Sequence, residues 1–225
     1  MPTRPLSSTA TDHLLDAADR LLARYGYRKM TIDDLATEAG IGKGSVYLCF
    51  ESKESIALGC IDRMVERLLA RLRELAAGGG GVPERLKAML VERVLHRFDY
   101  ARQHSRSLDD LLSSVRPRLL ERRAAYFRAE AAVLATVIEE GGRTGRLVAR
   151  HPLETAETLV LATNALLPYS LSPRELGRRA EIQRKVEAIT ELMLNGLVPP
   201  GAAARNGQID HSPARSRGTS GSRMR

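Results

Sequence analysis

The 225-residue sequence is poor in the residues that build disulfide, metal and aromatic-rich sites. It has two cysteines, no tryptophan and only 4% aromatic residues, so aliphatic side chains must form most of its core. Two cysteines are too few for a disulfide framework. The five histidines stand in no HExxH pattern and beside no CxxC pair. We therefore expect neither a metal site nor a cofactor.

Signatures of catalysis and of membrane insertion are also missing. The glycines at 78–81 and 141–146 follow helical patterns rather than strands, so they indicate turns and not phosphate loops. Nothing resembles a nucleophile elbow or an acid–base pair, which argues against an enzyme. The densest apolar run, Leu159–Leu167, is far shorter than the ~18 residues of a membrane span. Aspartates interrupt the early apolar segment, so we expect no secretory signal and a cytoplasmic protein that does not contact membranes.

The charge of the chain is positive but unevenly distributed. The net charge is +8, yet residues 1–56 hold seven lysines and arginines against eight acidic residues, a net charge of −1. Residues 199–225 hold five arginines against one aspartate, a net charge of +4. Total charge therefore argues only weakly for nucleic-acid binding.

Apolar residues recur at helical spacing along most of the chain, and no segment alternates with the period of a strand. The pattern predicts an all-α fold of about nine helices. Their expected ranges are 12–25, 31–39, 42–50, 52–77, 83–98, 107–115, 117–140, 153–167 and 173–195. Residues 1–11 are expected to form a flexible arm, and residues 199–225, rich in Gly, Ser and Arg, a disordered tail.

The stretch Thr31–Phe50, TIDDLATEAGIGKGSVYLCF, is the most informative part of the sequence. Thr31 and Asp34 have the spacing of a capping box at a helix N-terminus. Gly40 stands where a left-handed turn would end that helix, and Ile41 can close the core behind it. A second short helix follows, so the stretch has the form of a helix-turn-helix motif.

The second helix of the motif has distinct inner and outer faces. At 100° per residue, Val46, Cys49 and Phe50 point inward. Gly44 and Leu48 point outward, with Ser45 and Tyr47 beside them. This short outer face of small, polar and aromatic residues is the one that would meet DNA.

Together these features resemble the TetR/AcrR family of bacterial transcriptional regulators. The resemblance runs from Leu14 to Ile61, about a fifth of the chain, and includes Gly26-Tyr27, Ala39-Gly40-Ile41, Lys43 to Tyr47, and Phe50 followed by Ser52-Lys53-Glu54. The rest matches the family only in helix number and order. Leu48 and Cys49 depart from the family, which often has a polar residue and then an aromatic or histidine there. Operator preference is therefore not carried over.

The resemblance implies a DNA surface formed by Thr31, Lys43, Ser45, Tyr47 and Lys53. Physical chemistry agrees, because Thr31 can offer its hydroxyl to a phosphate and the lysines can displace counterions. Gly44 would let DNA approach closely, and Leu48 could touch a thymine methyl. The alternatives are a cap, solvated side chains and a packing tyrosine, and for Leu48 packing against the next helix.

The resemblance also implies a helix-turn-helix domain at 12–54 and an effector-binding and dimerisation domain at 55–198. Apolar walls with a few hydroxyls suit a small organic ligand, with ordinary bundle core as the alternative. The candidate ligand-binding residues are Met64, Leu68, Met89, Phe98, Tyr100, Tyr126 and Phe127. The arginines at 116, 118, 122, 123 and 128 are interpreted as a solvated face.

The last two predicted helices are the candidate dimer interface, since they could pair with a symmetry mate as a four-helix contact. The candidate residues are Leu159, Thr163, Leu166, Ile182, Val186, Ile189 and Met193. One recognition helix covers one half-site, so a dimer is needed for a useful specificity ratio. Cys49 and Cys60 could form a redox switch or act as small buried hydrophobes.

The resulting hypothesis is a homodimeric repressor that leaves a palindromic operator when a small molecule enters its core domain. A regulator without a ligand, an activator, and a helical ligand-binding protein with a vestigial DNA-binding head are the alternatives.

Overall fold

The computed structural model describes residues 8–104, 108–168 and 177–196. Within these ranges the chain is helical and contains no strand, which confirms the predicted all-α class. The helices are α1 (Ser8–Tyr25), α2 (Ile32–Ala39), α3 (Lys43–Cys49), α4 (Lys53–Ala77), α5 (Val82–Gln103), α6 (Leu108–Arg143), α7 (Pro152–Ala162), the 3-10 helix η1 (Asn164–Leu166) and α8 (Arg179–Asn195).

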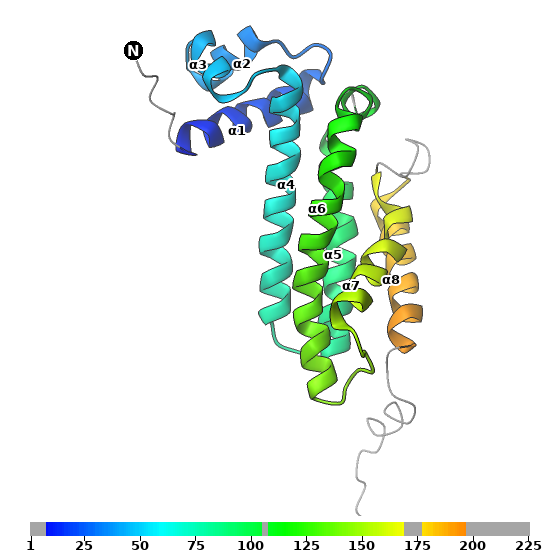
Figure 1. Cartoon of the computed structure of the whole chain (residues 1–225). Coiled ribbons are helices and arrows are strands. Elements are labelled where there is room, and N and C mark those ends of the chain that lie inside the picture. The colour runs from blue at the N-terminus through cyan, green and yellow to red at the C-terminus, as the bar shows by residue number, and fades with distance from the viewer. Residues whose placement is uncertain (1–7, 105–107, 169–176, 197–225) are drawn as a thin grey trace, which may run out of the picture.

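The first three helices form a compact head at one end of an elongated molecule (Figure 1). The 25-residue helix α4 begins four residues after α3 ends and runs from the head down the length of the body. Ser52 caps the N-terminus of α4, because its hydroxyl accepts the amide of Ser55 at 3.1 Å. Helix α4 thus starts in the head and continues into the body.

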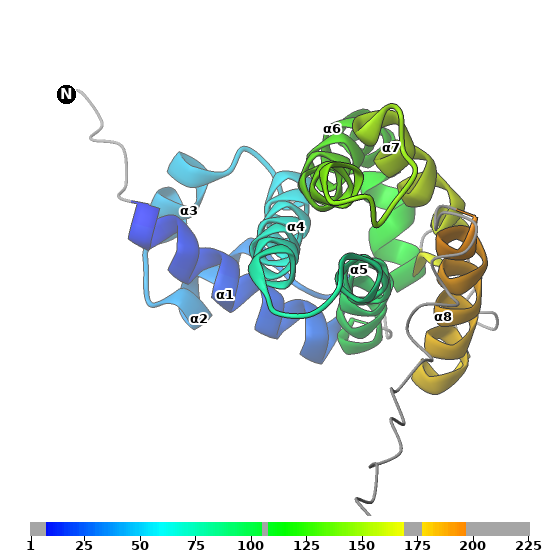
Figure 2. The same cartoon turned by 90° about the horizontal axis from the view of Figure 1, so that it is seen from below.

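The body is a bundle built on α4, α5 and α6, which pack along one another. Helix α7 lies against α6, and α8 lies against α5 on the side away from α4 (Figures 1 and 2). The glycines at 78–81 separate α4 from α5, as the sequence predicts, and Pro83 stands in the first turn of α5.

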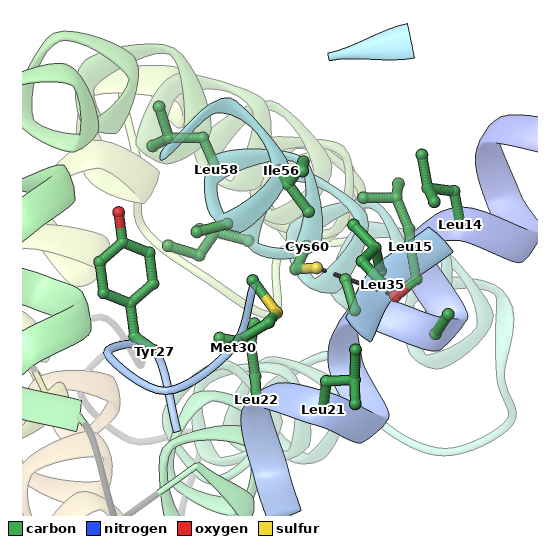
Figure 3. Packing of buried hydrophobic residues seen from close by; sticks show 14 of the residues in the cluster. Leu14, Leu15, Leu21, Leu22, Tyr27, Met30, Leu35, Ile56, Leu58 and Cys60 are labelled. Atoms are coloured by element: carbon green, nitrogen blue, oxygen red, sulfur yellow. Dashed lines mark hydrogen bonds between the residues drawn. The ribbon is translucent and has the colours of Figure 1, made fainter. Parts of the chain in front are cut away.

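A single apolar cluster joins the head to the body (Figure 3). Leu14 and Leu22 of α1 and Leu35 of α2 pack against Ile56 and Leu58 of α4, and all five are buried. Two buried residues of α6, Leu111 and Val115, belong to the same cluster. The beginning of α6 therefore packs directly beneath the head.

Two predicted helices are one in the structure. The segments predicted at 107–115 and 117–140 form the single helix α6, which contains Pro117, so the described residues hold eight α-helices rather than about nine. Pro117 cannot donate to the carbonyl of Ser113 four residues earlier. Both residues are exposed, so water can satisfy that carbonyl and the helix continues.

Other bounds differ by smaller amounts. Helix α1 begins at Ser8, four residues before its predicted start and inside the predicted arm. Residues 1–7 and 197–225, which cover the rest of that arm and the predicted tail, lie outside the described residues, as do the predicted cap at Ser107 and the predicted start of the last helix at Pro173. Among the described helices, none has the length and apolar character needed to cross a membrane.

Candidate DNA-binding surface and ligand cavity

Thr31 forms the predicted capping box at the start of α2. Its hydroxyl accepts the amide of Asp34 at 3.1 Å, and the Asp34 carboxylate accepts the Thr31 amide at 3.1 Å. The Thr31 hydroxyl also donates to the Asp34 carboxylate at 2.7 Å. Thr31 is exposed, so the cap lies at the surface and holds α2 in place at its first residue.

The turn between α2 and α3 has the predicted left-handed glycine. Gly40 has φ +65° and ψ +31°, a conformation that costs other residues about 1–2 kcal/mol. The next amide, that of Ile41, donates to the carbonyl of Ala36 at 3.0 Å and closes the end of α2. Ile41 packs against the apolar cluster of the head, as predicted. The angle between the two helices is thereby set by backbone geometry.

Helix α3 presents the predicted outer face. Val46 is fully buried and anchors the helix, whereas the side chains of Tyr47 and Leu48 are 51% and 58% exposed. Gly44 is exposed as well, and a side-chain carbon added there would meet nothing within 4 Å. Leu48 belongs to none of the apolar clusters of the described chain, and this face of α3 is open to a partner.

The two lysines of the predicted surface differ in their surroundings. Lys43 is exposed, and its Nζ lies 2.9 Å from a carboxylate oxygen of Asp33. The hydrogen bond and the charge of Asp33 raise the pKa of Lys43. Lys53 is half-buried: its Nζ donates to the carbonyl of Arg28 at 3.2 Å and lies 4.5 Å from the centre of the Tyr27 ring. Burial lowers the pKa of Lys53. Lys53 thus ties α4 to the loop before α2, a structural role that sequence reasoning missed.

A cavity of about 400 Å³ lies in the body between α4, α5 and α6. Its volume is within the usual range of small-molecule sites, roughly 300–1,000 Å³. Four predicted ligand-binding residues line it: Met64, Tyr100, Tyr126 and Phe127. The others on its wall, which the sequence did not single out, are Ile61, Val65, Arg97, Ala101, Leu111, Leu112, Arg116, Leu119, Leu120, Arg123 and Pro168.

The other three predicted ligand-binding residues do not line the cavity. Leu68 and Met89 are fully buried in the packed core among α4, α5, α6 and α7. Phe98 is buried in a third cluster with residues of η1 and α8. Helical periodicity marks all of these positions as inward, but it does not tell a filled core from the wall of a cavity.

Most of the arginine run of α6 is exposed, as predicted for a solvated face: Arg116, Arg118, Arg122 and Arg128. Arg122 also forms an ion pair with Asp62 of α4. Arg116 and the half-buried Arg123 in addition line the cavity. They are seven residues apart, which places them on one side of the helix, and this spacing is the signal that could have found them.

Both cavity tyrosines reach out of the cavity to aspartates. The Tyr100 hydroxyl donates to Asp19 of α1 at 3.1 Å, and the Tyr126 hydroxyl donates to Asp62 of α4. Burial is the largest cause that raises the pKa of each hydroxyl, and the neighbouring aspartate raises it further. Asp19 also accepts Arg63 of α4 at 2.6 Å. The cavity wall is thus hydrogen-bonded to the head and to the helix that carries it.

The residues predicted for the dimer interface face the core of their own chain. Five are buried, Leu159, Thr163, Leu166, Ile182 and Val186, and two are half-buried against the same clusters, Ile189 and Met193. Thr163 even accepts a guanidinium hydrogen bond from Arg93 at 2.8 Å. An apolar stripe shows that a helix packs on something, but not whether that neighbour lies in the same chain.

Both cysteines are free thiols. Cys60 is buried, and its Sγ lies 3.8 Å from the carbonyl of Leu15 (Figure 3). Burial raises the pKa of the Cys60 thiol well above its ordinary value, which opposes the reactive thiolate form. Cys49 is half-buried with its Sγ 3.8 Å from the Thr11 hydroxyl.

A capped helix-turn-helix head on a helical body with an internal cavity defines a class of protein, the DNA-binding regulators with a ligand-binding domain. Residues 14–60 match the model of the bacterial regulatory proteins of the tetR family. The helix-turn-helix head is therefore that of the TetR/AcrR family of transcriptional regulators.

Curated relatives are similar in the head and, in one case, along most of the chain. The chain is 26% identical over 207 residues to the transcriptional regulator EthR of Mycolicibacterium smegmatis, a match that covers 89% of this chain and 93% of the relative. It is 41% identical over 66 residues to the repressor KstR2 of Rhodococcus jostii, which covers 29% of this chain and 32% of the relative. With the regulator YerO of Bacillus subtilis, the match likewise spans 32% of the relative, at 28% identity.

Solved structures share the fold along most of their length. A TetR/AcrR-family regulator from Thermobifida fusca is 28% identical, with a TM-score of 0.58 and coverage of 84% of this chain and 98% of that one. A transcriptional regulator from Cytophaga hutchinsonii has a TM-score of 0.71 at 20% identity, with the same coverage. The likeness in fold therefore extends through the body as well as the head.

Proposed function

We propose that this protein is a homodimeric transcriptional repressor that binds a palindromic operator through α3 and leaves it when a small organic molecule occupies the cavity. One observation carries the proposal: α4 follows the exposed recognition helix directly and also forms a wall of the cavity. Occupancy of the cavity is thereby coupled to the position of the head. A protein that reads the chromosome in this way acts in the cytoplasm.

The outer face of α3 is the DNA-reading surface in this proposal. Tyr47 and Leu48 are exposed side by side and can reach base edges or the sugar–phosphate backbone. Gly44 allows the DNA backbone to come close to the helix. Lys43 exchanges its ion pair with Asp33 for a phosphate, a small cost because exposed ion pairs contribute only about 0–1 kcal/mol. This face is flanked by Thr31, Ser45 and Lys53.

Release follows from the hydrogen bonds that join the cavity wall to the head. Tyr100 of α5 holds Asp19 of α1, and Asp19 is bound at the same time by Arg63 of α4. On the opposite wall, Tyr126 of α6 binds Asp62 of α4. An occupant that pushes α4 away from α5 and α6 breaks these contacts and swings α4 with the head. The two recognition helices of a dimer then no longer fit successive major grooves.

The dimer forms through the exposed face of α7 and α8 rather than through the buried stripe. Leu161 of α7 and Leu192 of α8 are 69% and 76% exposed, the highest values among the large apolar residues of the described chain. Small exposed residues are near them in sequence: Ala162 and Ala165 after Leu161, and Ala188 one turn before Leu192. Pairing of this face with its symmetry mate covers both leucines and sets two heads at a fixed separation.

Selection of genomic fragments by the purified protein, followed by fluorescence anisotropy at fixed salt, tests the proposal. Lys43→Ala and Tyr47→Ala should each weaken binding to a selected fragment by about tenfold or more. Arg73→Ala, which removes an exposed positive charge from the part of α4 far from the head, is the matched control and should change little. Failure to enrich any fragment overturns DNA binding, and equal binding by all three variants overturns the assignment of α3.

The same fragments test regulation. A thermal-shift screen of small organic compounds should find one that stabilises the protein and lowers its affinity for the fragment. Release by a ligand is overturned if a compound that binds the cavity strengthens DNA binding. It is also overturned if no cavity-binding compound changes the affinity for DNA.

A further inference from the structure

The charged groups on the cavity wall are all of one sign. Arg97, Arg116 and Arg123 line the cavity, and none of the described residues on its wall is an aspartate or glutamate. The hydroxyls of Tyr100 and Tyr126 are engaged by aspartates that lie outside the cavity. The remaining wall is aliphatic or aromatic. Arginine is therefore the one charged residue type among the described wall residues, on an otherwise apolar surface.

Two of these arginines, Arg97 and Arg123, are connected through neighbouring side chains. The guanidinium of Arg123 lies 5.4 Å from the centre of the Phe127 ring, and that of Arg93 lies 5.1 Å from the same ring. Arg93 and Arg97 both bind the buried carboxylate of Glu130. Arg123 is thus connected to Arg97 through Phe127, Arg93 and Glu130, and we call this part of the wall the Arg97–Arg123 end.

The Arg97–Arg123 end is rigid and shielded from water. Arg97 and Glu130 are both buried, and hydrogen bonds from Arg97 to Glu130 hold its guanidinium in place. Arg123 is half-buried and supported by the Phe127 ring. Guanidinium groups fixed in this way bind carboxylates with little loss of side-chain entropy, and burial strengthens the attraction. The same groups repel a cation.

Another part of the wall, formed by α4 and the first turn of α6, is apolar. Ile61, Met64 and Val65 of α4 and Leu111 of α6 line it, and all four belong to the cluster that joins the head to the body. An aliphatic chain laid against these residues lies directly beneath the head. This is the part of the wall whose displacement would move α4.

We propose that the effector is an anionic amphiphile, an organic acid with one aliphatic body, whose carboxylate binds at the Arg97–Arg123 end. The body lies along Ile61, Met64 and Val65 and separates α4 from α6. This inference rests on the proposed ligand-released function and specifies the chemical class of the ligand. The arginines favour an anionic ligand, and contact of its aliphatic body with Ile61, Met64 and Val65 displaces α4.

Three probes of equal chain length test the choice of charge: dodecanoate, dodecan-1-ol and dodecyltrimethylammonium, each below its aggregation concentration. Titration calorimetry on the full chain should show dodecanoate binding about tenfold or more tighter than the alcohol, with the cation weakest. Arg123→Gln should bring dodecanoate close to the alcohol and leave the alcohol unchanged. Arg128→Gln, an exposed arginine of the same helix that does not line the cavity, should behave as the parent.

Arg116→Gln is the second variant, because Arg116 is exposed at the cavity wall and its loss leaves the buried cluster intact. It should weaken dodecanoate in the same direction if Arg123→Gln fails to fold. Any of four results overturns the proposed ligand class. Two concern the parent protein: equal binding of acid and alcohol, or preference for the cation. The others are no binding of any probe, and an acid preference that survives both substitutions. Operator binding by the unliganded protein is a separate readout. If the unliganded protein does not bind an operator, the proposed regulatory function is wrong. If it binds and is released by neutral compounds that occupy the cavity, only the anionic ligand class is wrong.

Discussion

Tyr100→Phe tests the connection between the cavity and the head. The Tyr100 ring lines the cavity, and its hydroxyl donates to Asp19 of α1 at 3.1 Å. The substitution removes one oxygen and keeps the ring, so packing changes little. We expect the DNA-binding conformer to lose the stabilisation that this hydrogen bond provides, while the released conformer, in which the contact is already broken, loses nothing.

The magnitude follows from the environment of Asp19. A hydrogen bond to a charged group contributes about 1.5–3 kcal/mol. Here the Asp19 side chain is 21% exposed and keeps Arg63 at 2.6 Å, so water and Arg63 compensate in part. About 1 kcal/mol remains, which corresponds to roughly a fivefold shift toward the released conformer. Because a ligand that selects this conformer binds in proportion to its population, its apparent affinity should rise about fivefold.

Calorimetry with a compound that releases the parent protein from its operator measures this affinity. Tyr100→Phe should bind the compound about fivefold more tightly, and release from DNA should need correspondingly less of it. Tyr25→Phe, which removes a hydroxyl from an exposed tyrosine of α1, is the control. Weaker binding by Tyr100→Phe would show that the hydroxyl contacts the ligand, and unchanged binding would show that it plays no part in coupling. Either result refutes the reasoning.

Three further predictions concern stability, assembly and thiol chemistry. Glu130→Gln leaves two buried guanidinium groups without their shared carboxylate and should cost about 3–5 kcal/mol in urea unfolding, whereas the exposed Glu139→Gln should cost under about 0.5. Leu192→Glu should give a folded monomer in analytical ultracentrifugation, and a persistent dimer would contradict the proposed interface. At about pH 8, iodoacetamide should modify Cys49 and spare Cys60, because a raised pKa keeps the Cys60 thiol protonated. Equal rates of labelling by mass spectrometry would contradict this.

The head was predictable in detail because its determinants are local. Thr31 and Asp34 are three residues apart, and a capping box needs no other part of the chain. Gly40 stands at the only position where the turn requires a left-handed residue, and the structure has it there. The exposure of Tyr47 and Leu48 follows from helical geometry once Val46 is known to face inward.

The body was predictable only in outline because its determinants are distant in sequence. Periodicity identified Leu159 and Val186 as apolar faces, but their neighbours are helices of the same chain rather than a second copy. It also placed Met89 with the cavity residues, although packing around Met89 leaves no space. The cluster of Arg93, Arg97 and Glu130 joins residues more than 30 positions apart, and no local pattern marks it.

The measurement that tests the central claim most directly is a comparison of the DNA sequences selected by the parent protein and by Leu48→Gln. If α3 lies in the major groove, the parent should select a palindrome, and the substitution should change the preferred base at symmetry-related positions of its two half-sites. Arg73→Ala should select the parent sequence. An unchanged preference with weaker binding, or a selected sequence without two-fold symmetry, would contradict the account.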